Sequence, residues 1–256
     1  GTVPKQPVAT GAELLSYGPF STSNRLQQPY NDQLQFGTGQ FSVMLWFKST
    51  ASGSEQFIRK GDPSNDVGCF ESYITAVGGA GNIRFVIKHT DGSSNTVLNS
   101  GTQGYNNGVW NHYVGVRRSN NSMELYLNGE LSSSTTTTHS VTNSSSILDI
   151  GSVGSVANGA ANTFLSLVRI SGSAPSAEQI KKMYYDEKCL FHENAKCALY
   201  GTSNDINAIA YDDTSNILHA GTSSGRSDFL GLNRINNTTT AVTTAISASD
   251  GFVAEQ

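Results

Sequence analysis

The sequence contains few cysteines. Cys69, Cys189 and Cys197 are the only three, too few and too unevenly spaced for a disulfide framework. Buried free thiols are the simpler interpretation, and a Cys189–Cys197 disulfide is the alternative if the protein is secreted. The chain also starts at Gly1 without a methionine, so we expect a fragment or a processed product.

Clustered positive charge is missing as well. Charged residues make up 14 % of the chain, the formal net charge is −4, and basic pairs such as Arg117-Arg118 and Lys181-Lys182 stay isolated. Phosphate binding needs a basic patch or stripe, so the sequence predicts no nucleic-acid partner. No apolar run approaches the roughly 20 residues of a membrane-spanning helix, so no membrane partner is predicted either.

The carboxylate pair of a glycoside hydrolase is not recognisable. Such enzymes need two carboxylates on opposite sides of the sugar bond, whereas Glu71 and Glu124 each stand alone on a predicted strand. We interpret both as solvated strand positions and predict no enzymatic activity. The run Gly221-Thr222-Ser223-Ser224-Gly225 matches the letters of a nucleophile elbow, but it precedes another strand and no histidine follows His219.

Alternating apolar and polar residues are abundant, and Gly, Ser, Thr and Asn clusters separate them. This combination is typical of many strands joined by turns. The clearest strands are residues 41–48, 83–88, 110–118, 123–128 and 164–170. Met44 and Trp46 lie on the second face of the first of these, which indicates that this face is covered too. The Ser/Thr-rich residues 131–146 predict a short edge strand and a loop.

One helix is predicted after the last of these strands. Pro175 and Ser176 open it, and Gln179 stands three residues after Ser176, as a capping box requires. Ile180 and Met183 begin an apolar stripe at helical spacing. We expect this stripe to close one end of a β-sandwich.

These elements predict three regions. Residues 1–30 hold four prolines and form an extended lead-in, residues 31–190 form the sandwich, and residues 198–256 form a small β module. Short strands are expected in the module at 208–211, 217–221, 229–232 and 242–246. It looks like one blade of a β-propeller. Because one small sheet cannot bury both faces, we expect other chains or missing sequence to complete it.

A family resemblance rests on the order of four short motifs. They are Phe36-Gly37-Thr38-Gly39, Trp110-Asn111-His112-Tyr113, Leu125-Tyr126-Leu127-Asn128-Gly129 and Leu148-Asp149-Ile150-Gly151. With the capped helix after them, the chain resembles the laminin G-like and pentraxin-like branch of the concanavalin A-like superfamily, over about residues 30–188. The resemblance implies an all-β, antiparallel two-sheet jelly roll with one capping helix. Trp110 is expected to anchor its strand in the core, and Asn128-Gly129 to form a tight hairpin turn.

The whole arrangement also resembles sandwich modules in tail fibres and appendages of tailed bacteriophages. That resemblance implies a non-catalytic module on the phage particle, a homotrimer that contacts host surface glycans and other virion proteins. The alternative is a secreted laminin G-like adhesion module that binds protein or glycan with calcium. A polysaccharide-degrading enzyme is the third hypothesis.

One group of residues is a candidate sugar-binding site. For sugar, Tyr105, Asn106 and Asn107 combine an aromatic ring with amides, and Asp91 and Asn95 are expected on a neighbouring loop. The alternative is a plain turn before Trp110.

Two further sets of residues carry potential metal ligands. Asp62, Asn65 and Asp66 form an oxygen-rich loop that suits calcium, with a simple turn as the alternative. Cys189, His192 and Cys197 offer three zinc ligands but lack a clear fourth. Apart from possible calcium, the sequence predicts no cofactor.

Overall fold

The chain forms two compact units. The computed structural model describes residues 2–256 except 63–64, 77–78, 90–94, 102, 143–145, 153–158, 194, 197, 204 and 232, and it leaves out the side chains of 62, 65 and 66. The first unit comprises Gly1–Gln6 and Ser16–Tyr184, and the second comprises Pro7–Leu15 and Tyr185–Gln256. Among the described residues, no helix is long and apolar enough to cross a membrane.

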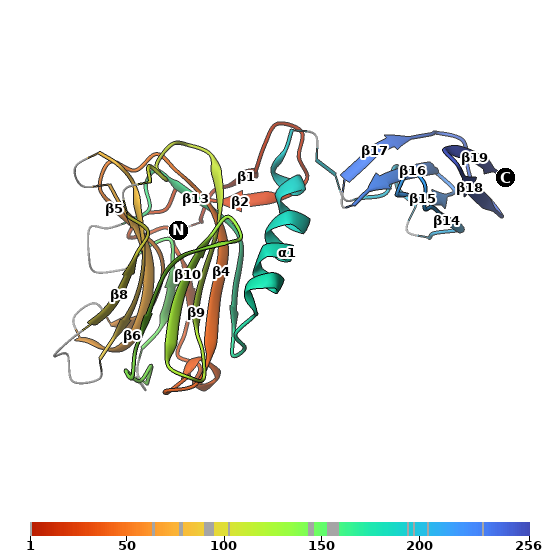
Figure 1. The fold of residues 1–256 in the computed structure, drawn as a ribbon. Helices are drawn as coiled ribbons and strands as arrows, with labels where there is room; N and C mark the ends of the chain where they lie inside the picture. The colour runs from red at the N-terminus through yellow and green to blue at the C-terminus, as the bar shows by residue number, and fades with distance from the viewer. Residues whose placement is uncertain are drawn as a thin grey trace. The chain divides into compact units, whose positions relative to one another are not determined.

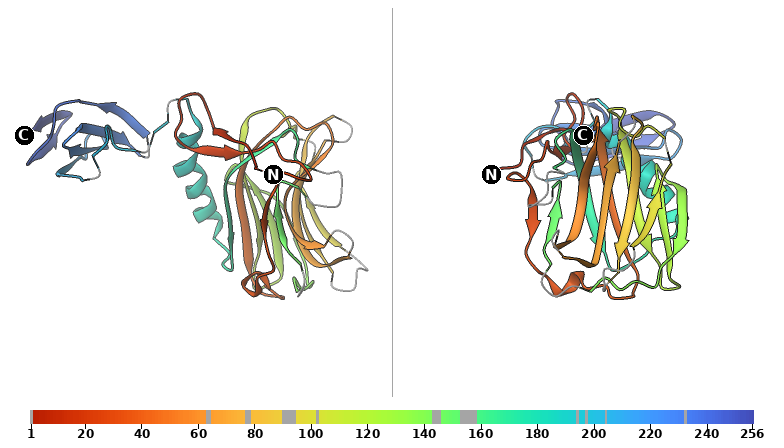
Figure 2. Two further views of the ribbon diagram at one scale, coloured as in Figure 1. Left: turned by 180° about the vertical axis from the view of Figure 1, so that it is seen from behind. Right: turned by 90° about the vertical axis from the view of Figure 1, so that its left-hand side faces the viewer.

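The first unit is a sandwich of two sheets (Figures 1 and 2). The seven-stranded sheet runs in the order β1 (Lys5–Pro7), β2 (Leu15–Tyr17), β13 (Thr163–Ser171), β4 (Phe41–Ser49), β9 (Trp110–Arg117), β10 (Ser122–Leu127), β11 (Glu130–Thr136). The six-stranded sheet runs in the order β3 (Leu26–Gln28), β12 (Leu148–Ile150), β5 (Ser54–Asp62), β6 (Asn65–Thr75), β7 (Asn82–Lys88), β8 (Asn95–Asn99). The prediction of an all-β antiparallel sandwich is confirmed.

The first thirty residues contain β1, β2 and β3, which extend both sheets at one edge. A short 3-10 helix, η1 (Asp32–Leu34), follows them. The lead-in is therefore part of the sandwich sheets.

The core lies between the two sheets and follows the predicted alternation. Alternate side chains of β4, from Phe41 to Phe47, face Ile83, Phe85 and Ile87 of β7, and all of them are fully buried. The Phe47 and Phe57 rings stack across the core with centroids 4.7 Å apart. Each large apolar side chain removed from water contributes roughly 1.5–3 kcal/mol, so burial of this layer stabilises the sandwich.

Tyr113, and not Trp110, anchors β9 in the core. Tyr113 is fully buried, whereas Trp110 at the start of the strand is half-buried. Two residues further on, a Cβ atom at Gly115 would lie 2.5 Å from the Tyr113 hydroxyl and 2.9 Å from the Phe85 ring of the opposite sheet. The absence of a side chain at Gly115 thus lets the two sheets approach at this point.

The predicted turns and edge strand are present. Asn128 and Gly129 have φ angles of 51° and 83° and join β10 to β11 in a two-residue turn. The Ser/Thr-rich segment supplies β11, which is the edge strand beyond β10. The predicted pairing of residues 110–118 with 123–128 is the β9–β10 hairpin.

Helix α1 (Ala177–Glu187) covers the outer face of the seven-stranded sheet (Figure 1). The capping box is confirmed: the Ser176 amide donates to Gln179 Oε1 at 2.8 Å, and the Gln179 amide donates to Ser176 Oγ at 3.3 Å. Ile180 packs against Met44, and Tyr184 stacks on Trp46 with ring centroids 5.7 Å apart.

The predicted position of the helix at one end of the sandwich is therefore wrong. The outward side chains of β4 and β9 are apolar, so an amphipathic helix buries more surface by lying across this face than by capping an end.

The second unit contains a four-stranded and a two-stranded antiparallel sheet. The first has the order β14 (Ala208–Asp212), β15 (Ile217–Thr222), β16 (Gly225–Leu230), β17 (Asn233–Asn237), and the second pairs β18 (Ile246–Ser249) with β19 (Phe252–Glu255). A 3-10 helix, η2 (Lys188–Phe191), precedes these strands.

The predicted strand at 242–246 is wrong, because β17 occupies that place in the sheet. Val242 is fully buried and lies directly over Gly221, where a Cβ atom would meet Val242 Cγ1 at 2.6 Å. Packing against the sheet, and not pairing with it, explains why this residue is apolar.

Candidate functional site

Polar side chains gather on the outer face of the six-stranded sheet. The strand register sets Arg59 of β5 opposite Glu71 of β6, and Tyr73 of β6 opposite Arg84 of β7. Side chains that are directly paired, or two residues apart on one strand, share a face of the sheet. Because the alternate residues of β7 fill the core, these four side chains point away from it. In the right-hand view of Figure 2 this sheet faces the viewer and α1 lies behind it.

A pocket of about 270 Å³ opens on this face. Its lining residues come from β5, β6 and β7: Ser54, Glu55, Gln56, Arg59, Glu71, Tyr73 and Lys88. The volume is close to the lower end of the range for small-molecule sites. The lining is predominantly polar, so the pocket suits a ligand with many hydrogen-bonding groups.

Glu71 bridges two cations in this pocket. Arg59 Nη1 lies 3.2 Å from Glu71 Oε2, and Lys88 Nζ lies 3.3 Å from Glu71 Oε1. All three side chains are nearly buried, with 8–9 % of their surface exposed. The interpretation of Glu71 as a solitary, solvated carboxylate is therefore wrong, because the register of three strands surrounds it with positive charge.

The pocket walls are held by hydrogen bonds to the backbone and to a neighbouring loop. The Gln56 amide donates to the carbonyls of Ile58 and Ser72 at 2.9 and 3.0 Å. Glu55 accepts hydrogen bonds from the Asn162 amide at 2.8 Å and the Thr163 hydroxyl at 2.7 Å. These contacts fix Gln56 and Glu55 before any ligand arrives.

Tyr73 supplies the aromatic group of the pocket. Arg84 Nη1 donates to the Tyr73 hydroxyl at 3.2 Å, and the Arg84 guanidinium carbon lies 5.8 Å from the centre of the Tyr73 ring. Tyr73 is half-buried, so part of its ring remains accessible. An aromatic ring beside fixed polar groups offers a ligand both an apolar surface and hydrogen bonds.

The predicted sugar cluster at residues 105–107 has structural roles. The Asn106 side chain accepts from the Gly81 amide at 2.8 Å and donates to the carbonyls of Ala51 and Gly79, both at 3.0 Å. Asn107 Oδ1 accepts from the Val109 amide at 3.2 Å. The amide of Asn106 is thus used to tie three loop segments together.

The other members of that cluster do not join it. Tyr105 packs edge-on against Phe47, and its amide bonds to Gly81 just before β7 begins. Asn95 pairs with Lys88 at the opposite end of β7, about 20 Å away along an extended strand. Asp91 lies outside the described residues.

The predicted metal ligands are only partly described. The side chains of Asp62, Asn65 and Asp66 and all of Cys197 lie outside the description, so calcium binding and the Cys189–Cys197 disulfide stay predictions. Within the described part of the chain, no group of three His, Cys, Asp or Glu side chains is placed to hold a metal ion.

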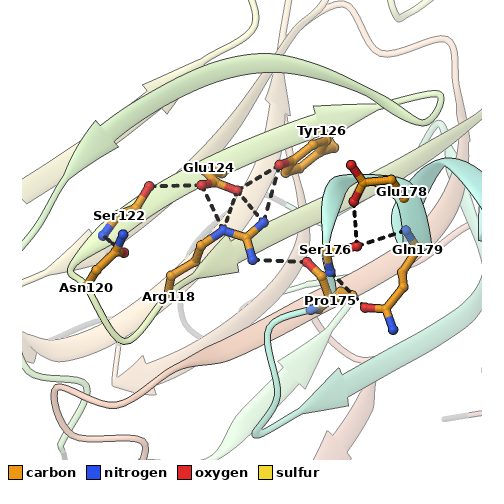
Figure 3. A network of polar contacts seen from close by, with 9 residues as sticks. All are labelled: Arg118, Asn120, Ser122, Glu124, Tyr126, Pro175, Ser176, Glu178 and Gln179. Atoms are coloured by element: carbon orange, nitrogen blue, oxygen red, sulfur yellow. Dashed lines mark hydrogen bonds and ion pairs between the residues drawn. The ribbon is translucent and has the colours of Figure 1, made fainter.

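Glu124 belongs to a hydrogen-bonded network between the β9–β10 hairpin and the start of α1 (Figure 3). Arg118 Nε donates to both Glu124 oxygens at 2.8 Å, and the Tyr126 hydroxyl donates at 2.8 Å. These hydrogen bonds hold the pKa of Glu124 below its ordinary value and raise that of Arg118. Arg118 also donates to the Pro175 carbonyl at 3.2 Å, which ties the hairpin to the helix. Glu124 therefore has a structural role.

The run from Gly221 to Gly225 comprises the end of β15, a two-residue turn at Ser223-Ser224 and the first residue of β16. A nucleophile elbow needs a strand followed by a helix. The matching letters therefore have no catalytic meaning here.

Comparison with known proteins identifies the family. The model described as the concanavalin A-like lectin/glucanases superfamily matches residues 20–181. The chain belongs to this superfamily. Membership agrees with the two-sheet sandwich of the first unit, but proteins with one fold can have many functions, so the family does not decide which ligand is bound. A search of curated proteins gave no match.

The chain is similar to several solved structures at low sequence identity. The botulinum neurotoxin serotype D ligand binding domain, in complex with N-acetylneuraminic acid, is 14 % identical with a TM-score of 0.52; the match covers 91 % of this chain and 58 % of that domain. The Ruminococcus gnavus IT-sialidase CBM40 bound to α2,3-sialyllactose is 15 % identical over 72 % of this chain and 100 % of that chain, with a TM-score of 0.49. The heptameric SAP-like pentraxin from Limulus polyphemus is 16 % identical over 62 % of this chain and 72 % of that chain, with a TM-score of 0.46.

Proposed function

We propose that the protein is a non-catalytic carbohydrate-binding module and that the pocket on the six-stranded sheet is its glycan site. The observation that carries the proposal is the pocket itself, in which Tyr73 stands beside fixed polar side chains. A sugar presents hydroxyl groups at its edge and C–H groups on its faces, so it needs this combination of partners. The neurotoxin domain in complex with N-acetylneuraminic acid illustrates that a protein of this fold can bind a sugar.

A glycan array with the full chain tests the proposal. We expect binding to a defined set of oligosaccharides and its loss, by tenfold or more, in Tyr73→Ala. Tyr30→Ala is the matched control, because Tyr30 is 44 % exposed and does not line the pocket. Absence of binding to every glycan, or equal binding by both variants, would overturn the proposal.

We further propose that the chain is part of a tailed-phage appendage and assembles as a homotrimer that contacts host surface glycans. The bacteriophage resemblance supports this, and so do apolar side chains on the surface of the small second unit. Phe252 is 81 % exposed, Ile209 59 % and Tyr211 56 %. Copies of the chain would cover this surface, and several weak sugar sites on one particle would bind together.

Native mass measurement tests the assembly. The expected mass is three times that of the chain. A monomer whose second unit remains folded would contradict the proposed trimer, and it would leave the sugar site unaffected.

A further inference from the structure

Strand β7 carries two outward side chains with unmet hydrogen-bonding capacity. Arg84 Nε and Asn82 Oδ1 are both buried, and neither has a partner among the described residues. The two residues are separated by one position, so they lie on the same face as the pocket. Buried polar atoms are almost always paired in folded proteins, so two exceptions on one strand face call for an explanation.

Arg84 differs from the two cations that line the pocket. Arg59 and Lys88 share Glu71, whereas Arg84 has no ion pair with any described carboxylate, and its one side-chain hydrogen bond goes to the neutral Tyr73 hydroxyl. A guanidinium keeps its charge at all physiological pH values and has five N–H donors. At Arg84, only one of them donates to a described residue.

The charge around the pocket favours an anion. Two cations, Arg59 and Lys88, line it against the two carboxylates Glu55 and Glu71, so the charges of the lining balance. Arg84, which bonds to the lining residue Tyr73, adds a third cation beside the pocket in a chain of net charge −4. Both carboxylates already accept hydrogen bonds from protein groups. The charge that remains uncompensated is therefore that of Arg84.

We infer that the ligand of this site is an acidic sugar whose carboxylate binds Arg84 while its ring packs beside Tyr73. A carboxylate accepts two parallel N–H bonds from a guanidinium, which matches the donors that Arg84 has left. This inference rests on the proposed glycan site and specifies the chemical class of its ligand. Uronic acids and nonulosonic acids share the required carboxylate.

Calorimetric titration of the full chain with matched sugars tests the inference. The probes are an oligosaccharide with terminal N-acetylneuraminic acid, a glucuronic acid oligosaccharide, and both after reduction of the carboxyl group to an alcohol. We expect at least one acidic probe to bind tenfold or more tighter than its reduced form, and this preference to weaken as salt is added. Which acidic probe binds distinguishes the two sources of the carboxylate.

Variants assign the effect to Arg84. Arg84→Gln should remove the tenfold preference, and Arg84→Lys should keep part of it, because a lysine retains the charge but not the paired donors. Lys182→Gln is the control: it removes the same charge from an exposed position on α1. The comparison of each probe with its reduced form needs no variant, so it stands even if Arg84→Gln fails to fold.

Two outcomes would overturn the inference, and they differ in meaning. Equal binding of acidic and reduced probes, with loss in Tyr73→Ala, would overturn the acidic ligand and leave the glycan site in place. Absence of binding to every glycan would overturn the glycan site, and the acidic ligand with it.

Discussion

The two sheets of the sandwich have opposite outer faces. On the seven-stranded sheet, the outward residues of β4 and β9 include Met44, Trp46 and Val114, all buried under α1. On the six-stranded sheet, the outward residues of β6 and β7 include Glu71 and Tyr73, which line a pocket, and Arg84, which is paired with Tyr73. Both sheets are apolar on the inside. The character of the outward positions therefore decides which face receives a helix and which remains available to a ligand.

The two outer faces are also stabilised by different interactions. The helix-covered face is stabilised by removing apolar area from water, which depends little on geometry. The pocket face is held by charges that are nearly buried, and such charges require their partners to be present. Substitutions on the two faces should therefore lower the free energy of unfolding for different reasons: loss of buried apolar area on one face, and loss of a charged partner on the other.

The largest effect is expected on the helix-covered face. Trp46→Ala removes a side chain that is 2 % exposed and stacks on Tyr184, so the free energy of unfolding should fall by about 3–5 kcal/mol. Val97→Ala on the other face removes a side chain that is 46 % exposed and should change it by at most about 0.5 kcal/mol. Urea titration followed by tryptophan fluorescence measures both, because Trp46 and Trp110, the only two tryptophans, lie in the first unit. Equal losses of unfolding free energy in the two variants would contradict the view that only the helix-covered face is stabilised by buried apolar area.

A smaller loss is expected from Glu71→Gln in the pocket. Arg59 and Lys88 would then face each other with no neutralising charge, at a cost of about 2–3 kcal/mol in unfolding free energy. Glu130→Gln is the matched control, since the pair of Glu130 with Lys181 is exposed and should contribute less than about 0.5 kcal/mol. A loss in Glu71→Gln no greater than in the control would show that the pocket charges are solvated.

Removal of the helix cap should cost less again. Ser176→Ala deletes the hydroxyl that accepts from the Gln179 amide, and loss of such a cap costs about 1 kcal/mol. Ser132→Ala, at an exposed position of β11, should be neutral. The same urea titration compares the two, and an unchanged midpoint for Ser176→Ala would mean that packing alone fixes the helix.

The smallest effect is a difference in acid sensitivity. The pKa of Glu124 is lowered in the folded protein from its ordinary value of 4.5 by the Arg118 hydrogen bonds. A carboxyl group with a lowered folded pKa stabilises the protein above its unfolded pKa, and this stabilisation is lost as pH falls through the folded pKa. Between about pH 6 and about pH 3, the wild type should therefore lose more unfolding free energy than Glu124→Gln. A steeper loss in the variant would contradict the network in Figure 3.

Local patterns predicted the sandwich well. The alternation in β4 and β7, the capping box of α1 and the Asn128-Gly129 turn depend on residues close in sequence, and the structure contains all of them. The position of α1 was wrong because it depends on which sheet face has apolar outward residues. That information comes from the pairing of β4 with β9, which are far apart in the chain.

The candidate site was missed for the same reason. Arg59, Glu71 and Lys88 come from three strands, and only the register brings them together. Each one alone is typical of a solvated strand face. The sequence pattern that could have indicated the site is the polar side of β7, where Arg84 and Lys88 alternate with core residues. In contrast, Tyr105 and Asn106 are adjacent in sequence and combine an aromatic ring with an amide, which predicts a sugar site, although their contacts serve a turn.

Gly115 links the inside of the sandwich to the ligand face. Its missing side chain sets how closely β9 approaches Phe85, and Phe85 stands between Arg84 and Val86 on β7. A methyl group at position 115 would force the Tyr113 hydroxyl and the Phe85 ring to shift, and overpacking of this kind is transmitted to the neighbouring backbone, here that of β7 next to Arg84. The spacing of the two layers would thus bear on the proposed sugar site through the hydrophobic interior, although Gly115 does not line the pocket.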